Sequence, residues 1–253
     1  MERCYWKIKM YKSFTIIIPA YNESKRIIRS LKDIDEYILK KSTGSSYEVI
    51  IVDDGSTDNT KDVVDNWINN EAKNKSSYKI ISYKQNQGKG YAVREGFLNT
   101  NSELVLYTDA DGASPIEEAE KLLLVIDKGF DMVCGSRILK SRETKVDMSV
   151  KRRFVGFVFQ CILKSLGLAD LKDTQCGFKL FKTTAAKDLA KKQKCFNYSF
   201  DIEYLFLAKK YGYKIKEVPI NWYHVEGSKV NILRDSVKML AEVLKIRFIY
   251  KYN

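Results

Sequence analysis

The chain has 253 residues, 45% of them hydrophobic and 30% charged, which is typical of a globular protein with a sizeable core. Lys and Arg outnumber Asp and Glu by 44 to 32, and the net charge of +12 favours polyanionic partners such as nucleic acid, an acidic membrane surface or phosphorylated substrates. The 5 cysteines show no paired spacing, which indicates reduced thiols in the cytosol, with neither a disulfide framework nor a zinc site, and the single His224 argues against histidine-based catalysis.

The first half of the chain alternates between strand-like and helix-like segments. Short apolar runs predict strands at 14–19, 47–54, 79–83, 104–108 and 131–137. Helices are predicted over 22–41, from about residue 57, after 88–90, and from Pro115, which suits a first helical turn. Near-continuous apolar strands joined by helices indicate a parallel sheet that is covered on both faces.

The second half follows without a repeat or a low-complexity linker. It is predicted to contain a basic loop, an apolar helix, a loop leading into a short strand, a helix capped by Ser199, a strand and a basic amphipathic helix, at 138–153, 154–168, 173–182, 198–213, 214–223 and 230–252. Pro219 inside the last strand suggests a sheet edge or a bulge. No signal peptide is visible, and the longest uncharged apolar stretch, 154–163, is shorter than the roughly 20 residues of a membrane span.

Three predicted strand ends carry polar residues, at 19–23, 53–56 and 109–111. Ligands of open α/β sheets bind beyond such carboxyl ends. Asp109 and Asp111 are one residue apart and repel each other unless a cation lies nearby. Their oxygens suit Mg²⁺ or Mn²⁺, which also bind diphosphate oxygens, so the pair predicts a metal site for a nucleotide diphosphate. A polar turn explains this pair alone equally well, but three marked strand ends together favour the ligand site.

Basic residues supply a second signal. Gln87–Gly90 lies between a strand and a helix, where backbone amides approach anions, although it lacks the P-loop spacing and a surface turn explains it equally well. Arginines at 137, 142, 152 and 153 flank the basic loop, beside the apolar helix. A solvated loop is the alternative, but this neighbourhood favours a ligand with an anionic head and a hydrocarbon tail. Gly227–Lys229 offers a weaker phosphate contact.

Two acidic residues, Asp201 and Glu203, are predicted in the first turn of a helix. Acidic residues at this position commonly complement the helix dipole. A direct catalytic role for Asp201 is therefore the less favoured of the two interpretations.

The motifs occur in a recognisable order: FTIIIPAYNE, VIIVDDGSTDNT, NQGKGYAVREG, TDADGA, CGSR, DTQCGFKLF, FDIE and GSKV. Over residues 13–250 the chain resembles glycosyltransferase family two enzymes of the GT-A fold, most closely the dolichyl-phosphate β-glucosyltransferases and next the dolichyl-phosphate mannose synthases. Ala113 stands where mannose synthases often carry glutamine, which favours the glucosyl branch. Eukaryotic members usually begin with a membrane-spanning helix, which is not visible here.

The resemblance implies a fold and a division of labour. The fold is α/β, with a Rossmann-like, mostly parallel central sheet flanked by helices in a single GT-A catalytic domain over 1–253. Residues 13–137 would form the half that binds the nucleotide sugar. Residues 138–253 would form the acceptor-binding half, including the C-terminal amphipathic helix.

The resemblance also implies site residues. Asp109 and Asp111 would hold Mg²⁺ or Mn²⁺ and, with Asp201 and Arg137, form the catalytic set. The nucleotide sugar would contact Pro19, Ala20, Tyr21, Glu23, Asp53, Asp54, Gly88, Lys89, Asp109, Ala110 and Asp111. The phosphate of the acceptor would contact Arg137, Arg152, Arg153, Gln175 and Lys229.

The implied reaction is the inverting transfer of glucose from UDP-glucose to dolichyl (polyprenyl) phosphate. A phosphate monoester has its second pKa near ~6, so this nucleophile has already lost its proton at neutral pH and needs a general base less than a hydroxyl does. Asp201 could then orient basic residues instead. The implied location is cytoplasmic, at the cytosolic face of a membrane, with peripheral contact through 154–168 and the C-terminal segment, for which core packing is the alternative.

Three other functions stay open from the sequence. A mannose synthase, or an enzyme using another nucleotide sugar, would share most of these motifs. A soluble transferase acting on a protein or glycan hydroxyl would need Asp201 as an indispensable base. A nucleic-acid-binding protein would explain the basic charge, but no recognised binding motif is present and the acidic pairs would line the cleft, so no nucleic acid is expected as a partner.

Overall fold

The computed structural model describes residues 11–250 apart from 12, 42–45, 169 and 226–231. In this part of the chain, one sheet of 7 strands is built in the order β3-β2-β1-β4-β6-β5-β7. The strands are β1 (Ser13–Ala20), β2 (Ser46–Asp53), β3 (Tyr78–Ser82), β4 (Leu104–Thr108), β5 (Met132–Ser136), β6 (Phe178–Lys182) and β7 (Ile215–Pro219). The mixed α/β architecture agrees with the predicted fold class.

The sheet is parallel except for β6. This strand runs antiparallel to both of its neighbours, with Leu104 opposite Lys182 and Met132 opposite Phe181. The first-half strands do run in one direction, as predicted, because β4 and β5 are both antiparallel to β6; β5, however, pairs with β6 and β7 and not with β4. An apolar strand pattern reports burial but carries no signal for strand order or direction, so a strand from the second half could insert without a trace in the sequence.

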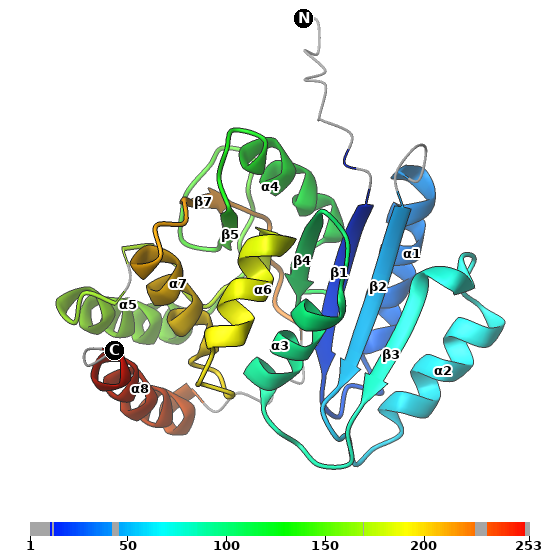
Figure 1. Ribbon diagram of the computed structural model, residues 1–253, viewed down its shortest axis with the longest axis horizontal. Helices are drawn as coiled ribbons and strands as arrows, with labels where there is room; N and C mark the ends of the chain where they lie inside the picture. The colour runs from blue at the N-terminus through cyan, green and yellow to red at the C-terminus, as the bar shows by residue number, and fades with distance from the viewer. Residues whose placement is uncertain (1–10, 12, 42–45, 169, 226–231, 251–253) are drawn as a thin grey trace, which may run out of the picture.

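Helices cover both faces of the sheet (Figure 1), with α3, α6 and α7 in front of it and α1 behind it. In β1, Ile17 points to one core, whereas Ile16 and Ile18 point to the other, as the two-residue period of a strand requires. The helices are α1 (Ile27–Lys41), α2 (Thr60–Asn70), α3 (Lys89–Asn99), α4 (Ala119–Ile126), α5 (Val150–Ser165), α6 (Thr183–Lys192), α7 (Phe200–Lys210) and α8 (Ile232–Ile249), with 3-10 turns η1 (Lys75–Ser77) and η2 (Ile116–Glu118).

Several predicted boundaries move. Helix α1 begins at Ile27 and not at residue 22, because the chain first makes a turn in which Asn22 takes the left-handed φ of 55°. Ser199 is the N-cap residue of α7, as predicted, but its hydroxyl donates to the carbonyl of Met239 at 3.4 Å and makes no capping hydrogen bond. Pro219 ends β7, which is an edge strand, as predicted.

Helices α5 and α8 pack against each other beside the sheet (Figure 1). Among the described residues, none of the helices combines the length and apolar character that crossing a membrane requires. The cavity described next is bordered by α5, with Met239 of α8 in its wall.

Candidate active site

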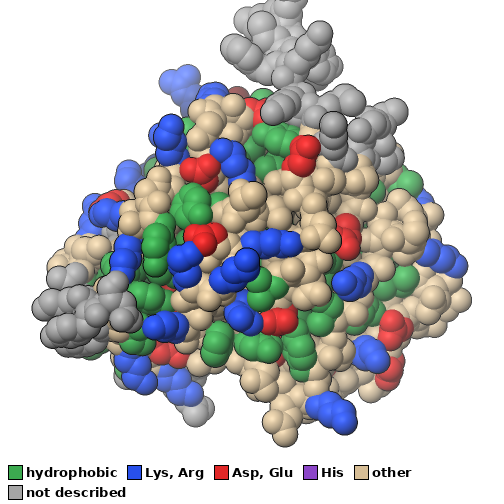
Figure 2. Space-filling model, viewed as in Figure 1, with side chains coloured by type: hydrophobic (Ala, Val, Ile, Leu, Met, Phe, Trp, Pro, Cys, Tyr) green, Lys and Arg blue, Asp and Glu red, His purple; other side chains and the backbone are tan. Residues whose placement is uncertain are grey.

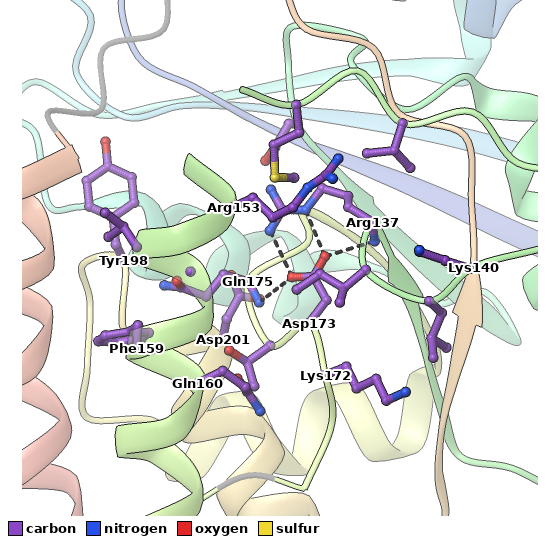
Figure 3. Close-up of a pocket in the computed structure, with 18 of the residues that line it drawn as sticks. Arg137, Lys140, Arg153, Phe159, Gln160, Lys172, Asp173, Gln175, Tyr198 and Asp201 are labelled. Carbon is purple, nitrogen blue, oxygen red and sulfur yellow. Dashed lines mark hydrogen bonds and ion pairs between the residues drawn. The ribbon is translucent and has the colours of Figure 1, made fainter. Parts of the chain in front are cut away.

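A cavity of about 660 Å³ lies at the carboxyl end of β4, between that strand end, α5 and the loops that follow β5 and precede β6 (Figure 3). Its positive charges come from Lys89, Arg137, Lys140, Arg153 and Lys172. Its negative charges come from Asp109, Asp173 and Asp201, and its apolar wall includes Val155, Phe159 and Met239. The cavity therefore combines anion-binding groups with a hydrocarbon surface.

Asp109 lies at the end of β4 and faces the cavity. Its Oδ1 accepts hydrogen bonds from Lys89 Nζ at 2.6 Å and from Tyr107 Oη at 3.2 Å, and its amide donates to the carbonyl of Gly177 at 3.1 Å. A Cβ atom on Gly177 would lie 2.1 Å from Asp109 Oδ2, so only glycine allows this approach. Burial disfavours the charged carboxylate, but Lys89 and these hydrogen bonds outweigh it and lower the pKa of Asp109. Lys89 has its pKa raised to about 12 because its attraction to Asp109 exceeds the opposing effect of burial.

Asp111 lies beside the cavity wall and not in it. Its Oδ1 accepts a hydrogen bond from the amide of Ala113 at 3.1 Å. Burial and the nearby charge of Asp109 raise the pKa of Asp111, while Lys89 and Arg26 act in the opposite direction. Arg26 in turn forms an ion pair with Glu23 at 2.7 Å. Glu23 therefore pairs with Arg26, and Arg26 is the residue whose charge acts on Asp111.

The aspartate pair offers carboxylate oxygens to the predicted divalent ion. Among the described residues, no group of three His, Cys, Asp or Glu side chains is arranged to hold a metal. Two hard carboxylates with a diphosphate and water as further ligands suit Mg²⁺ or Mn²⁺, which keep non-protein oxygens in their coordination sphere. Asp109 and Asp111 fit that description, and an ion would relieve the repulsion that raises the pKa of Asp111.

The side chains of the first acidic pair, Asp53 and Asp54, are buried and point into the protein interior. Asp53 accepts hydrogen bonds from the amide of Ser56 at 3.2 Å and from Ser82 Oγ at 2.8 Å. Asp54 accepts from Asn86 Nδ2 at 2.9 Å and from the amides of residues 87 and 88 at 2.8 and 2.9 Å. Burial raises the pKa of Asp54, and those backbone amides oppose the rise. This carboxylate therefore holds the turn that presents Lys89.

The other residues predicted to contact the nucleotide sugar lie around the strand ends, outside the cavity. Pro19 and Ala20 are buried at the end of β1, Ala110 is buried between the two aspartates, and Tyr21 is exposed. Gly88 precedes α3 with a φ of 105°, and a Cβ atom there would lie 2.4 Å from the carbonyl oxygen of residue 196. Contacts of these residues with a nucleotide stay a prediction.

Arg137 enters the cavity from the end of β5, held by Asp173 (Figure 3). Its Nε and Nη2 each donate to a different oxygen of Asp173 at 2.8 Å, and its amide donates at 2.9 Å. Its guanidinium carbon also lies 5.8 Å from the centre of the Trp222 ring. Burial opposes the charge of Asp173, but Arg137 outweighs it and lowers the pKa of that carboxyl. A guanidinium has five N–H groups, so this pairing leaves donors directed elsewhere.

The basic loop before α5 is anchored to the segment after β7. The amide of Trp222 donates to the carbonyl of Lys145 at 3.0 Å, and the amide of Asp147 donates back to Trp222 at 2.9 Å. Arg153 and Gln175 line the cavity, whereas Arg142 is exposed outside it; contact of Arg153 and Gln175 with an acceptor phosphate stays a prediction. The side chain of Arg152 and the whole of Lys229 lie outside the described residues.

Asp201, from the first turn of α7, lines the cavity and rests on a buried lysine. Its Oδ1 accepts a hydrogen bond from Lys179 Nζ at 2.5 Å, and Lys179 is fully buried. Burial raises the pKa of Asp201, and Lys179 opposes that rise. Glu203, two residues later, accepts from the amides of residues 194 and 195 and from Tyr250 Oη, and so holds a loop together away from the cavity.

Comparison with known proteins identifies the family. The family described as Glycosyl transferase family 2 matches residues 15–190. The chain belongs to this family. A dolichyl-phosphate beta-glucosyltransferase of Saccharomyces cerevisiae is 37% identical over 249 residues, covering 93% of this chain and 74% of the relative. The Homo sapiens protein of the same name is 32% identical over 252 residues, covering 94% and 76%.

Solved structures agree on the fold. Glucosyl-3-phosphoglycerate synthase from Mycobacterium tuberculosis, in complex with Mn²⁺ and UDP-glucose, has a TM-score of 0.68 at 18% identity, over 97% of this chain and 84% of that one. A mannosyltransferase from Pyrobaculum calidifontis, in complex with GDP-Man and Mn²⁺, has a TM-score of 0.62 at 20% identity, over 97% and 65%. The predicted GT-A fold is confirmed, and this family 2 protein is a glycosyltransferase.

Two site residues of this family 2 chain were missed in the sequence. Lys179 lies in the motif DTQCGFKLF but looks like an ordinary polar position of a strand. Arg26, whose charge lowers the pKa of Asp111, lies in the turn before α1 and looks like a solvated helix residue. A lysine between two apolar residues of a short strand was the available signal for Lys179, because a buried lysine requires a partner.

Proposed function

We propose that this family 2 chain transfers glucose from UDP-glucose to dolichyl or a related polyprenyl phosphate, with inversion at the anomeric carbon and release of UDP. The observation that carries the proposal is that Lys89 and Asp109 line the same cavity as Arg137, Arg153 and an apolar wall. Relatives that align with most of this chain are named dolichyl-phosphate beta-glucosyltransferases, and this name supports glucose as the sugar and dolichyl phosphate as the acceptor.

The donor side rests on the aspartate pair and on Lys89. Asp109 and Asp111 would hold Mg²⁺ or Mn²⁺, which supplies positive charge to the diphosphate; structural neighbours were crystallised with Mn²⁺ and a nucleotide sugar. Lys89, at the first position of α3, adds a fixed cation and the partial positive charge of a helix N-terminus. These groups would stabilise the negative charge that develops on the leaving UDP.

The acceptor side rests on the arginines and on α5. Arg137 and Arg153 would bind the lipid phosphate, and Val155, Phe159 and Met239 would contact the first isoprenoid units. A phosphate oxygen attacks the anomeric carbon while the bond to UDP breaks on the opposite face, so electrons move from acceptor to UDP. Since the phosphate is largely dianionic at neutral pH, no proton has to be removed.

The membrane contact is proposed for the outer face of α5. Phe154, Phe157 and Val158 follow a helical spacing of three and four residues and are 67%, 65% and 42% exposed. On the face in Figure 2, Lys and Arg side chains are spread among hydrophobic ones, with acidic side chains between them. An apolar helix face with exposed cations on the same helix, here Arg153 and Lys164, suits the cytosolic surface of an anionic membrane.

The deciding experiment is sugar transfer to lipid. The purified protein is incubated with Mg²⁺ or Mn²⁺, a short polyprenyl phosphate and, in parallel, labelled UDP-glucose, GDP-mannose and other nucleotide sugars. Label from UDP-glucose should appear in the organic extract and should be lost when the metal is chelated. Transfer from GDP-mannose alone would assign the mannosyl reaction instead, and label in protein or glycan but not in lipid would overturn the acceptor.

The acceptor assignment has a matched test on α5. Arg153 lines the cavity, whereas Lys164 is an exposed cation on the same helix outside it. Arg153→Ala should raise the KM for lipid phosphate about 10-fold, with the KM for UDP-glucose nearly unchanged, because one charge-assisted phosphate contact is lost. Lys164→Ala should leave both constants unchanged. Equal increases of both KM values in Arg153→Ala would contradict the assignment.

Liposome flotation tests the membrane contact. The double variant Phe154→Ser/Phe157→Ser should float less with anionic liposomes than the wild type does. The control variant Leu39→Ser/Leu124→Ser removes two exposed leucines of α1 and α4, and it should float like the wild type. Equal flotation of all three proteins would remove α5 as the contact.

A further inference from the structure

One lysine lies beneath the cavity, and the reaction described above does not use it. Lys179 is the second residue of β6 and has no exposed surface, and its ammonium group donates to Asp201 Oδ1 at 2.5 Å and to the carbonyl of Cys176 at 2.7 Å. Burying an ammonium ion is strongly unfavourable unless it is paired and hydrogen-bonded. The ammonium group of Lys179 is paired in this way, and it therefore places a fixed positive charge beside the cavity.

The two partners of Lys179 belong to two separate parts of the cavity. Asp201 comes from α7 and lines the cavity wall. Cys176 belongs to the loop before β6, whose neighbouring residues Asp173 and Gln175 also line the cavity. The next residue, Gly177, accepts the hydrogen bond from the Asp109 amide. One ammonium group therefore ties the α7 wall to the loop that supports Asp109.

A second lysine is arranged about the same ring. Lys179 Nζ lies 6.0 Å and Lys89 Nζ lies 5.6 Å from the centre of the Tyr107 ring, and Tyr107 Oη donates to Asp109. Lys89 lies close enough to Asp201 for an electrostatic attraction as well as to its partner Asp109. The charges thus alternate through the site: Lys179, Asp201, Lys89 and Asp109.

We propose, building on the transferase function above, that Lys179 is a positioning residue that holds Asp201 in the cavity wall as a permanent anion, so that Asp201 orients Lys89 toward the diphosphate instead of accepting a proton. Oδ1 of Asp201 is already occupied by the ammonium group of Lys179. The acceptor phosphate brings no proton that a base must remove. Both facts favour a fixed anion over a general base.

The alternative is that Lys179 and Asp201 only stabilise the fold. Four variants separate the two roles: Lys179→Met, Lys179→Arg, Asp201→Asn and the double variant Lys179→Met/Asp201→Asn. Each is measured for kcat and KM in the polyprenyl phosphate reaction and for thermal unfolding. Lys182→Met is the matched control, because Lys182 lies on the same strand and pairs with Asp131 at 2.8 Å, with 41% of its side chain exposed.

A positioning role predicts a fall in kcat that stability does not explain. Lys179→Met should lower kcat about 10- to 100-fold with the KM for UDP-glucose changed little, as a small displacement of a catalytic group does. It should also lower the melting temperature, since Asp201 is left buried without a partner. The double variant should recover the melting temperature but not kcat. Lys179→Arg should keep more kcat than Lys179→Met, and Lys182→Met should match the wild type.

The outcomes that overturn the proposal are distinct from those that overturn the function. Recovery of kcat together with stability in the double variant would make the pair purely structural. A wild-type kcat in Lys179→Met would also remove the positioning role while leaving the transferase function intact. A wild-type protein that moves no sugar to lipid phosphate would overturn the function itself, and the positioning role with it.

Discussion

Two acidic pairs end two strands on either side of β1, yet they do different work. Asp53 is the last residue of β2 and Asp54 follows it, whereas Asp109 and Asp111 follow β4; both strands are parallel to β1. The first pair is almost completely buried, at 3% and 2% exposure, and its oxygens are occupied by amides, an asparagine and a serine. In the second pair, Asp109 keeps 35% of its side chain exposed and faces a lysine and the cavity.

The two pairs differ in the segment of chain that donates hydrogen bonds to them. The turn at residues 86–88 brings three donors onto Asp54, whereas in the described part of the chain the segment after β4 brings one donor, the Ala113 amide, onto Asp111. A carboxylate whose oxygens are filled by protein donors supports a loop. A carboxylate that faces a cavity and a cation remains available to a ligand. Four predictions test this distinction, from the largest expected effect to the smallest.

The largest effect is expected at the second pair. Asp111→Ala should lower kcat about 100- to 1000-fold even at saturating Mn²⁺, since one of two carboxylates that would hold the ion is lost. The melting temperature should change little. Steady-state transfer assays over a metal titration would measure this, and near-normal activity would show that the pair does not anchor the metal.

Two glycines allow the same comparison through sterics. Gly177→Ala would place a Cβ atom against the Asp109 carboxylate, and Gly55→Ala would place one 2.5 Å from the carbonyl carbon of residue 85. Gly177→Ala should lower kcat at least about 10-fold by displacing Asp109. Gly55→Ala, at a φ of 68°, should mainly reduce stability, by roughly 1–2 kcal/mol. A stability loss without a kcat effect in Gly177→Ala would contradict the comparison.

The first pair should respond in stability before catalysis. Asp54→Ala leaves the buried amide of Gly88 without its acceptor, and an unsatisfied buried donor costs about 1–3 kcal/mol. It also removes an acceptor from the exposed Asn86 side chain and from the amide of residue 87. Thermal unfolding should shift by about 5–10 °C for a chain of this size. Asp54→Asn keeps one acceptor oxygen and should lie between. An unchanged melting temperature with lost UDP binding would make Asp54 a ligand-binding residue.

The smallest effect concerns a supporting carboxylate on the cavity side, Asp173. Its pKa is lowered by Arg137, so the folded protein binds protons there less readily than the unfolded chain. The stabilisation is fully present above the ordinary carboxyl pKa of about 4 and is lost as the pH falls through the lowered value. Asp173→Asn should therefore cost about 1–3 kcal/mol at pH 7, and this difference should shrink in urea unfolding below about pH 4. A difference independent of pH would rule out the charge as its cause.

Much of this arrangement was predictable from local pattern. The strand at 104–108 was predicted at its observed bounds, and the strand predicted at 79–83 runs from 78 to 82, because both are short apolar runs. The acidic strand ends at Asp54 and Asp109 are visible in the same local pattern, and the rule that ligands bind beyond carboxyl ends singles them out as candidates. The motifs further assign the family, because their order along the chain is specific. These are properties of neighbouring residues, and a short stretch of sequence holds all of the information that they need.

The tertiary structure alone decided which polar residues hold a neighbouring loop in place and which face the cavity. Lys179 is separated from Asp201 by 22 residues and Arg137 from Asp173 by 36, and each pair meets only because β6 inserts antiparallel between β4 and β5. Strand order is set by how the whole sheet buries its two faces and is not encoded in any one segment. For this reason the sequence by itself determined the elements, the family and the acidic strand ends. Folding in three dimensions determined the partner of each charge.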